Sequence, residues 1–236
     1  MSETFVLIAG GWHGGWAWRP VAQYLRAAGH RVLAPTMPGL NDGDDPTAYE
    51  LCDVISYVVD LVERKDLRDV TLVGHSWAGY VITGAVPRLV SRLRKVVYWS
   101  AFVPAEGVPL FGEVPPPLQD LLTTLARQSA DNTVLMPLER WRQAFMQDAT
   151  PDAQGIVHSL LVPQPFQYLT TPVAPVDFAR LGVPAGYVLT TEDITLTPTD
   201  WTRFTGRLGL TPTLAPGSHE ACFTQPDSLA RALLTA

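Results

Sequence analysis

The chain has 236 residues, of which 47% are hydrophobic and 17% are charged, and its formal net charge is −6. This length is enough for a full hydrophobic core, and single α/β domains of roughly 200 to 250 residues are common. The low charge, without a basic block, argues against a nucleic-acid partner, because phosphate binding relies on clustered Lys and Arg.

The N-terminal segment and the cysteines bear on where the protein works. The start, MSETFVLIAGGWHGG, has only a short apolar stretch without a preceding positive segment, so we expect neither a signal peptide nor a membrane span. Cys52 and Cys222 lie far apart and outside metal-ligand spacing, so we expect free, small, buried thiols in a reducing compartment. The sequence therefore predicts a cytoplasmic protein that acts on a small molecule, with a homodimer as one option.

The first part of the chain alternates apolar runs with amphipathic segments. Short continuous apolar runs predict buried strands at residues 5–9, 30–35, 70–74 and 95–102. Apolar positions at steps of three and four predict helices over residues 19–28, 47–66 and 78–89. Strands that are apolar throughout and separated by helices indicate a mostly parallel sheet with helices on both faces.

This alternation stops after the strand at 95–102. Residues 104–180 are rich in proline, including Pro115-Pro116-Pro117, and contain short helical patterns without a convincing strand. The alternation then resumes, with strands predicted at 186–191 and 211–216 and helices near 198–209 and 226–234.

The interruption divides the chain into a core and an insertion. We predict an α/β core of about six strands, formed by residues 1–103 and 181–236, with a mainly helical cap over residues 104–180. Long insertions in compact domains are usually functional, so we expect this cap to act as a lid over a substrate pocket.

A candidate nucleophile lies between the predicted strand at 70–74 and the helix at 78–89. Gly74-His75-Ser76-Trp77-Ala78 is of the G-x-S-x-G type, with alanine at the last small position and Gly79 directly after it. In that strand–turn–helix context, a tight turn presents the serine hydroxyl beyond the sheet edge, and the helix N-terminus favours developing negative charge. We therefore predict that Ser76 is a catalytic nucleophile.

A serine nucleophile needs a base, and two histidines follow Ser76 in the chain. His158 lies in the insertion at helical spacing, where we expect an ordinary lid residue. His219 lies in APGSHEACF, just after the last predicted strand, where a loop returns to the carboxyl edge of the sheet. The chain order of this architecture is serine, acid, histidine, so we predict His219 as the general base.

The acid that orients the base is expected at another strand end. The segment GYVLTTED ends in Glu192 and Asp193, and we favour Asp193 because a short side chain fits a loop residue aimed at the histidine. Glu192 stays as the alternative, and Glu106 competes only weakly.

The segment GGWHGGWAW, residues 10–18, follows the first strand and combines glycines with tryptophans. Acyl transfer creates an oxyanion, which two backbone N–H groups hold: one from the residue after the nucleophile, Trp77, and one from this loop. We predict Gly11 as the second donor, with Gly10 and Trp12 as alternatives. Glycines would let the backbone approach the substrate oxygen and adopt positive φ. His13 is expected to brace the loop.

Over nearly its whole length the chain resembles the α/β-hydrolase superfamily, and within it the small plant-type methylesterase and hydroxynitrile lyase branch. The similar blocks are FVLIAGGWHGGWAW, AGHRVLAPTMPG, LVGHSWAG, TTEDITLTP and GSHEACFTQPDSLA. The resemblance implies an α/β-hydrolase fold with a cap, a Ser76–Asp193–His219 triad and no cofactor. No metal is expected, since no residues have ligand spacing.

The chain departs from that branch at several positions. Ala9-Gly10 stands where the branch often has His-Gly, and Trp77 is bulkier than the usual leucine. Lyase members carry threonine at the position of Gly10 and lysine directly after the catalytic histidine, where this chain has Glu220. These differences favour the esterase side of the branch.

The predicted reaction is hydrolysis of a carboxylic ester through an acyl-enzyme, with a small to medium, apolar or aromatic substrate. Aromatic residues suggest the pocket wall: Trp12, Phe102, Phe111, Trp141 and Phe166. Two alternatives stay open. The same site could run an elimination, lyase, C–C cleavage or cyclisation step, or the chain could be a non-catalytic ligand receptor.

Overall fold

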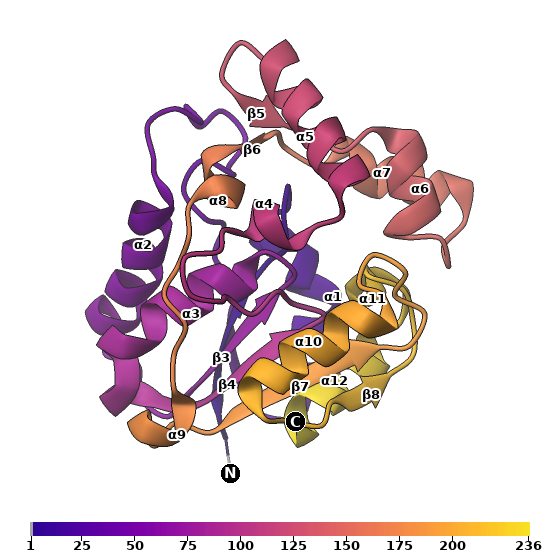
Figure 1. The fold of residues 1–236 in the computed structure, drawn as a ribbon. Helices are drawn as coiled ribbons and strands as arrows, with labels where there is room; N and C mark the ends of the chain where they lie inside the picture. The colour runs from indigo at the N-terminus through magenta and orange to yellow at the C-terminus, as the bar shows by residue number, and fades with distance from the viewer. Residues whose placement is uncertain (1) are drawn as a thin grey trace.

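The computed structural model describes residues 2–236 and shows a central sheet between two layers of helices (Figure 1). All strand pairings in the sheet are parallel, and the order is β2-β1-β3-β4-β7-β8. The strands span Thr4–Ile8 (β1), Arg31–Leu33 (β2), Val70–His75 (β3), Leu93–Trp99 (β4), Ala185–Thr190 (β7) and Thr213–Ala215 (β8). The predicted parallel sheet of about six strands is confirmed.

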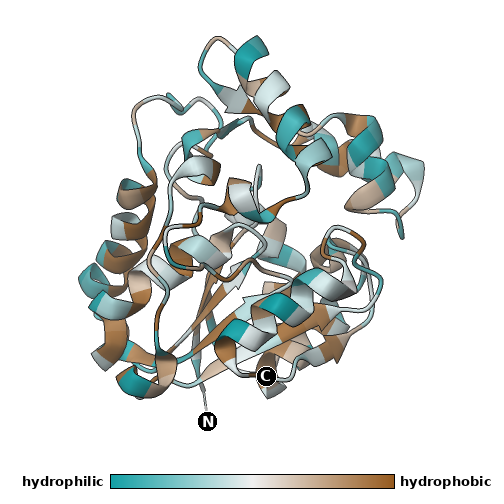
Figure 2. Ribbon diagram, viewed as in Figure 1, coloured by the Kyte–Doolittle hydropathy of each residue, from teal (hydrophilic) through white to brown (hydrophobic). Residues whose placement is uncertain are grey.

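Helices cover both faces of this sheet. One face packs against α1 (Arg19–Ala27), α11 (Ala221–Thr224) and α12 (Pro226–Thr235). The other packs against α2 (Leu51–Arg64), α3 (Ala78–Leu89) and α10 (Pro198–Leu208). Short 3-10 turns, η1 (Gly15–Trp18) and η2 (Val90–Arg92), precede α1 and β4. Figure 2 shows the hydrophobic residues concentrated on the strands and on the inner sides of these helices.

The element boundaries differ from the predicted ones by a few residues. The largest difference is at α2, which begins at Leu51 rather than at residue 47. A capping box explains this start, because the Asp53 side chain accepts a hydrogen bond from Glu50 N at 2.8 Å, and the Glu50 side chain caps in return. Cys222 is buried as expected, whereas Cys52 is exposed on α2, so the prediction of a buried thiol is wrong there.

The predicted cap contains six short helices and one small pair of antiparallel strands. The helices are α4 (Leu110–Glu113), α5 (Pro116–Gln128), α6 (Leu138–Ala144), α7 (Pro151–Ser159), α8 (Gln167–Thr170) and α9 (Phe178–Leu181). The strands β5 (Thr133–Val134) and β6 (Gln164–Pro165) pair antiparallel, although the sequence showed no convincing strand. Two-residue strands leave no periodic pattern, which explains the omission.

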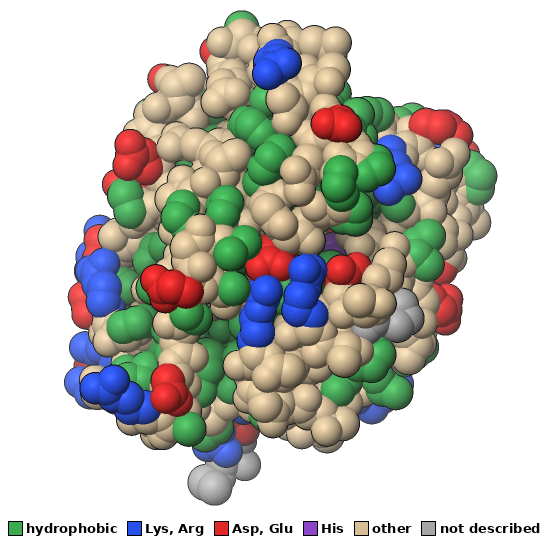
Figure 3. All heavy atoms as spheres, viewed as in Figure 1, with side chains coloured by type: hydrophobic (Ala, Val, Ile, Leu, Met, Phe, Trp, Pro, Cys, Tyr) green, Lys and Arg blue, Asp and Glu red, His purple; other side chains and the backbone are tan. Residues whose placement is uncertain are grey.

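Most of the predicted cap, residues 104–180, lies beyond the carboxyl ends of the strands. Figure 1 shows α5, α6 and α7 projecting above that edge, whereas α9 lies near the opposite edge, beside the start of β7. Part of the segment predicted as cap therefore runs back along the core. Figure 3 shows acidic and basic side chains scattered over one face of the molecule. Within residues 2–236, the structure has no helix that is both long and apolar enough to cross a membrane.

Candidate active site

Ser76 sits in a strained turn between β3 and α3. Its φ is 55°, in the left-handed region that non-glycine residues rarely adopt. Its carbonyl accepts hydrogen bonds from Gly79 N and Phe102 N, each at 3.1 Å. A Cβ on Gly74 would lie 2.9 Å from the Ala78 carbonyl oxygen, and one on Gly79 would lie 2.0 Å from that of Phe102. The turn is therefore tight enough to require glycine at both positions.

Asp193 and His219 form a buried hydrogen-bonded pair at the ends of β7 and β8. His219 Nδ1 lies 2.7 Å from Asp193 Oδ2, and both side chains are almost fully buried. The other carboxylate oxygen, Oδ1, accepts from Thr195 N at 2.8 Å and Leu196 N at 3.1 Å. These three bonds fix the carboxylate so that His219 presents Nε2 away from it. Glu192, the alternative acid, is exposed.

The ring of His219 lies beside the turn that carries Ser76. Its centroid is 4.7 Å from the ring of His75 and 5.5 Å from the ring of Phe145. His219 Nε2 is buried and has no hydrogen-bond partner within residues 2–236, so it makes no bond to the Ser76 hydroxyl in this structure. Bonds of this kind are often long without substrate and tighten when it binds.

Charged neighbours govern the protonation of His219. Burial acts to lower the pKa of His219, but the Asp193 charge, the hydrogen bond to Asp193 and the Glu220 charge outweigh it and raise that pKa above its ordinary value. Burial also raises the pKa of Glu220, against the opposing effects of His13 and His219. The imidazolium form of His219 is therefore favoured by its surroundings.

Two backbone N–H groups near Ser76 are available for an oxyanion. Among the described residues, neither Gly11 N nor Trp77 N donates a hydrogen bond to protein. Trp12 N, one of the alternatives from the sequence, donates to Gln164 Oε1 at 2.9 Å and is therefore occupied. This arrangement fits the predicted pair, Gly11 and Trp77.

The glycines of residues 10–15 serve close packing rather than positive φ, which corrects the expectation from the sequence. The residue with positive φ in this loop is Trp12, at 67°. A Cβ on Gly10 would lie 2.6 Å from His75 Nδ1, and one on Gly11 would lie 2.9 Å from Gln164 Oε1. A Cβ on Gly15 would lie only 1.9 Å from the Ala34 carbonyl oxygen. A side chain at Gly10, Gly11 or Gly15 would therefore clash with His75, Gln164 or Ala34, respectively.

His13 braces this loop, as its place in the sequence suggested. Its Nδ1 lies 2.7 Å from the Gly11 carbonyl oxygen, and its Nε2 lies 3.5 Å from Glu220 Oε2. Both His13 and Glu220 are buried, at 2% exposure each. The pair connects the loop that carries Gly11 with the loop that carries His219. His158 is not part of this cluster, because its Nε2 donates to the Met136 carbonyl within the predicted cap.

Residues of the predicted cap bond to both the loop that carries Asp193 and the loop that carries His219. Asp148 Oδ2 accepts from Ser218 N at 3.2 Å and from the Thr224 hydroxyl at 2.6 Å. The Phe145 carbonyl accepts from Glu220 N at 3.1 Å, and the Ala144 carbonyl accepts from the Thr195 hydroxyl at 2.7 Å. Residues 144–148 therefore clamp the two loops against each other.

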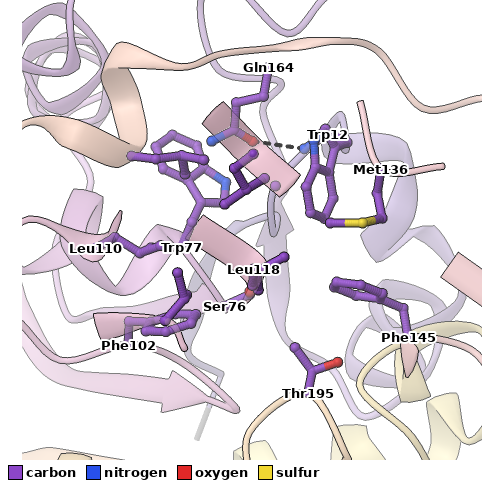
Figure 4. Close-up of a pocket in the computed structure, with 14 residues that line it drawn as sticks. Trp12, Ser76, Trp77, Phe102, Leu110, Leu118, Met136, Phe145, Gln164 and Thr195 are labelled. Carbon is purple, nitrogen blue, oxygen red and sulfur yellow. Dashed lines mark hydrogen bonds between the residues drawn. The ribbon is translucent and has the colours of Figure 1, made fainter. Parts of the chain in front are cut away.

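A small cavity, partly open to solvent, lies between Ser76 and the cap (Figure 4). Trp12 and Phe102 line it, as predicted. Its other lining residues are mostly apolar: Gly11, Trp77, Leu110, Val114, Leu118, Leu122, Met136, Phe145, Gln164, Leu169 and Thr195. Gln164 and Thr195 were not predicted as pocket residues: Gln164 belongs to no motif, and Thr195 lies in the block TTEDITLTP without a role of its own there.

The predicted pocket wall needs correction at three aromatic positions, since Phe111, Trp141 and Phe166 do not line the cavity. Phe111 and Phe166 pack edge to face with each other, with ring centroids 5.4 Å apart. Trp141 is fully buried and stacks on Phe145, at 5.3 Å. All three form the interior of the cap, which aromatic residues occupy as readily as a pocket wall.

One group of buried residues has the spacing of metal ligands. Ligand atoms of His75, His219 and Glu220 lie within 4.8 Å of one another. His219 Nδ1 binds Asp193 and Glu220 faces His13, whereas His75 stacks on Trp99 at 3.8 Å. Nε2 of His75 and Nε2 of His219 have no hydrogen-bond partner within residues 2–236.

Comparison with known protein families shows to which family the chain belongs. The chain matches the model of the alpha/beta hydrolase family over residues 5–232. The chain belongs to the alpha/beta hydrolase family. In the solved structures, an extracellular alpha/beta-hydrolase from a Paenibacillus species is 27% identical, with a TM-score of 0.93 over 99% of this chain and 98% of that one.

Curated relatives match a smaller part of the chain. A carbendazim hydrolyzing esterase from Nocardioides sp. (strain SG-4G) is 44% identical over 48% of this chain and 47% of its own length. Methylesterase 1 of Arabidopsis thaliana is 32% identical over 43% and 40%, and the alpha-hydroxynitrile lyase of the same plant is 32% identical over 42% and 40%. The match thus spans less than half of the length of these relatives. It confirms the resemblance to the methylesterase and hydroxynitrile lyase branch.

Proposed function

We propose that this protein is a serine esterase that hydrolyses a neutral carboxylic ester. The observation that carries the proposal is the 2.7 Å bond between Asp193 and His219, which leaves His219 Nε2 unbonded beside the strained turn of Ser76. Members of the family that resemble this chain include proteins named as esterases, which supports hydrolysis over other reactions of the same fold.

The proposed mechanism assigns a role to each group. Ser76 attacks the ester carbonyl while His219 takes its proton, and Asp193 holds the imidazole in the productive tautomer and stabilises the imidazolium. The N–H groups of Gly11 and Trp77 stabilise the oxyanion of the tetrahedral intermediate. The alcohol leaves with the proton from His219, and water then releases the acid by the same route.

The pocket indicates which esters fit. None of its lining side chains is charged, so a charged acyl group would lose its hydration without gaining a counter-charge. Apolar residues of the cap, such as Leu118 and Leu122, would surround the acyl chain instead. We therefore propose a small to medium neutral substrate with an apolar body.

The test is product analysis on a panel of methyl and aryl esters, using mass spectrometry and solvent labelled with ¹⁸O. Hydrolysis predicts that the acid and the alcohol appear in equal amounts and that the acid carries the label. A product formed without uptake of water, or by cleavage of a C–C bond, would instead support a lyase-type reaction at the same site. Tight binding without any turnover would support a receptor.

A further inference from the structure

Two buried side-chain N–H donors in the pocket have no acceptor within residues 2–236: Gln164 Nε2 and Trp77 Nε1. Gln164 is 1% exposed and Trp77 is 2% exposed, so protein surrounds both side chains. Buried polar groups almost always find a partner, and each exception in a folded protein needs an explanation. Indole nitrogens of Trp18, Trp99 and Trp141 also lack a partner, but those rings do not line the pocket.

The orientation of the Gln164 amide is fixed by the loop opposite. Gln164 Oε1 accepts from Trp12 N at 2.9 Å, and a backbone N–H can only donate, so the oxygen must face Trp12. Nε2 therefore occupies the other arm of the amide. Figure 4 shows the amide reaching into the pocket between the rings of Trp12 and Trp77. The two donors thus belong to one polar spot on an otherwise apolar wall.

This spot lies next to the proposed oxyanion hole. A Cβ on Gly11 would be 2.9 Å from Gln164 Oε1 and 3.6 Å from Trp77 Cδ1, the ring carbon bonded to Nε1. Gln164 and Trp77 therefore flank the residue whose N–H we assign to the oxyanion. A substrate atom bound by these donors would lie close to the scissile carbonyl.

The other polar side chains of the pocket, Ser76 and Thr195, are not free to donate a hydrogen bond to such a substrate atom. Ser76 is the proposed nucleophile, and the Thr195 hydroxyl donates its proton to the Ala144 carbonyl at 2.7 Å. No lining side chain is charged, which makes the site unsuited to a carboxylate. The spot offers N–H donors only, so its complement is a neutral oxygen or nitrogen acceptor.

We propose that Gln164 Nε2 and Trp77 Nε1 form a second acceptor-binding subsite that selects esters with a neutral hydrogen-bond acceptor close to the scissile carbonyl. This inference rests on the proposed esterase function and narrows its substrate class to α- or β-oxygenated neutral esters. Such an ester satisfies the two donors, whereas a plain alkyl ester of equal length leaves them unpaired. The subsite therefore discriminates mainly against substrates that lack the acceptor.

The test compares methyl β-ketooctanoate with methyl octanoate, which differ in one carbonyl group. We expect kcat/KM of the wild-type protein to favour the keto ester, and the ratio of the two values to fall about tenfold in Gln164→Met and in Trp77→Phe. Because the ratio is taken within each variant, a general loss of activity cancels. Gln128→Met, an exposed substitution on α5, serves as the matched control and should keep the wild-type ratio.

A binding measurement separates this inference from the proposed function. In a Ser76→Ala background, calorimetry should show tighter binding of the keto ester, and Gln164→Met and Trp77→Phe should each remove that preference. If neither ester is hydrolysed by the wild-type protein but the binding preference holds, the esterase proposal fails and the subsite stands. If the wild type shows no preference in turnover or in binding, or if both variants keep it, the subsite is overturned and the two donors serve bound water.

Discussion

The two walls of the pocket are held in different ways. The loops at the sheet edge are fixed by directional bonds: Asp193 accepts three hydrogen bonds, and residues 144–148 clamp the loops that carry Asp193 and His219. The opposite wall is made of apolar side chains from α4 and α5, such as Leu110 and Leu118, with Gln164 as its main polar group. Directional bonds set the positions of reacting groups, whereas apolar contacts set the size of what fits.

This difference predicts that substitutions at the sheet edge act on kcat and that substitutions in the cap wall act on KM. The largest effect is expected for Asp193→Asn. Thr195 N and Leu196 N hold Oδ1, so the amide nitrogen of the variant would face His219 Nδ1 and hold the imidazole in the wrong tautomer. We expect kcat to fall about 10⁴-fold with little change in KM. The control is Glu192→Gln, the exposed neighbour, whose kcat should stay within about twofold of wild type. Equal losses in both variants would contradict the assignment of the acid.

A smaller effect is expected at the clamp. Asp148→Ala removes the acceptor for Ser218 N and the Thr224 hydroxyl, so the His219 loop is held to residues 144–148 by the bond from Glu220 N to the Phe145 carbonyl alone. We expect kcat to fall about tenfold, because small misplacements of a reacting group are costly. Steady-state kinetics should show no such loss for Asp152→Ala, an exposed carboxylate on α7. A change confined to KM would show that the clamp shapes the pocket rather than the base.

The apolar wall should behave in the opposite manner. Leu118→Ala removes part of the surface that would cover an acyl chain, and we expect KM for a long-chain ester to rise about fivefold while kcat is kept. Leu160→Ala, an exposed cap residue at 52% exposure, is the matched control. A fall in kcat for Leu118→Ala would mean that the cap wall also positions the reacting groups.

The smallest effect concerns pH. Because the pKa of His219 is raised, its imidazole takes up a proton at a higher pH than an ordinary histidine does. The protonated ring cannot act as a base, so kcat/KM should already decrease, as the pH is lowered, before the pH reaches about 6.5. The Glu220 charge favours the imidazolium, so Glu220→Gln should move this acidic limb to lower pH, whereas Glu192→Gln should leave it in place. A profile that is flat between about pH 5 and pH 8 would exclude His219 as the base.

The same contrast explains how much could be predicted from the sequence. The six strands, Ser76 and the His219 loop follow from local patterns, because each strand end is marked by an apolar run followed by turn residues. Asp193 was chosen over Glu192 at the same strand end because its side chain is shorter, and the structure brings Asp193 to His219. The predicted cap followed from the proline-rich interruption of the strand–helix alternation, and the resemblance to a known family implied the same arrangement.

The pocket wall could not be derived in this way. Whether an aromatic side chain such as Phe111 or Trp141 faces a cavity or the cap interior depends on how short helices pack, and no period in the sequence encodes that. Gln164 was missed because a lone glutamine carries no motif, and its partner Trp12 lies 152 positions away in the chain. The four glycines of residues 10–15 were noticed, but their reason is contact with distant residues, which local patterns do not reveal.

Intact-protein mass spectrometry after treatment with a fluorophosphonate tests directly whether Ser76 is an activated nucleophile. We expect one adduct on the wild-type protein, none on Ser76→Ala, and full labelling of Ser159→Ala, in which an exposed serine on α7 is replaced. Absence of an adduct on the folded wild-type protein, or an adduct that persists in Ser76→Ala, would contradict this role of Ser76.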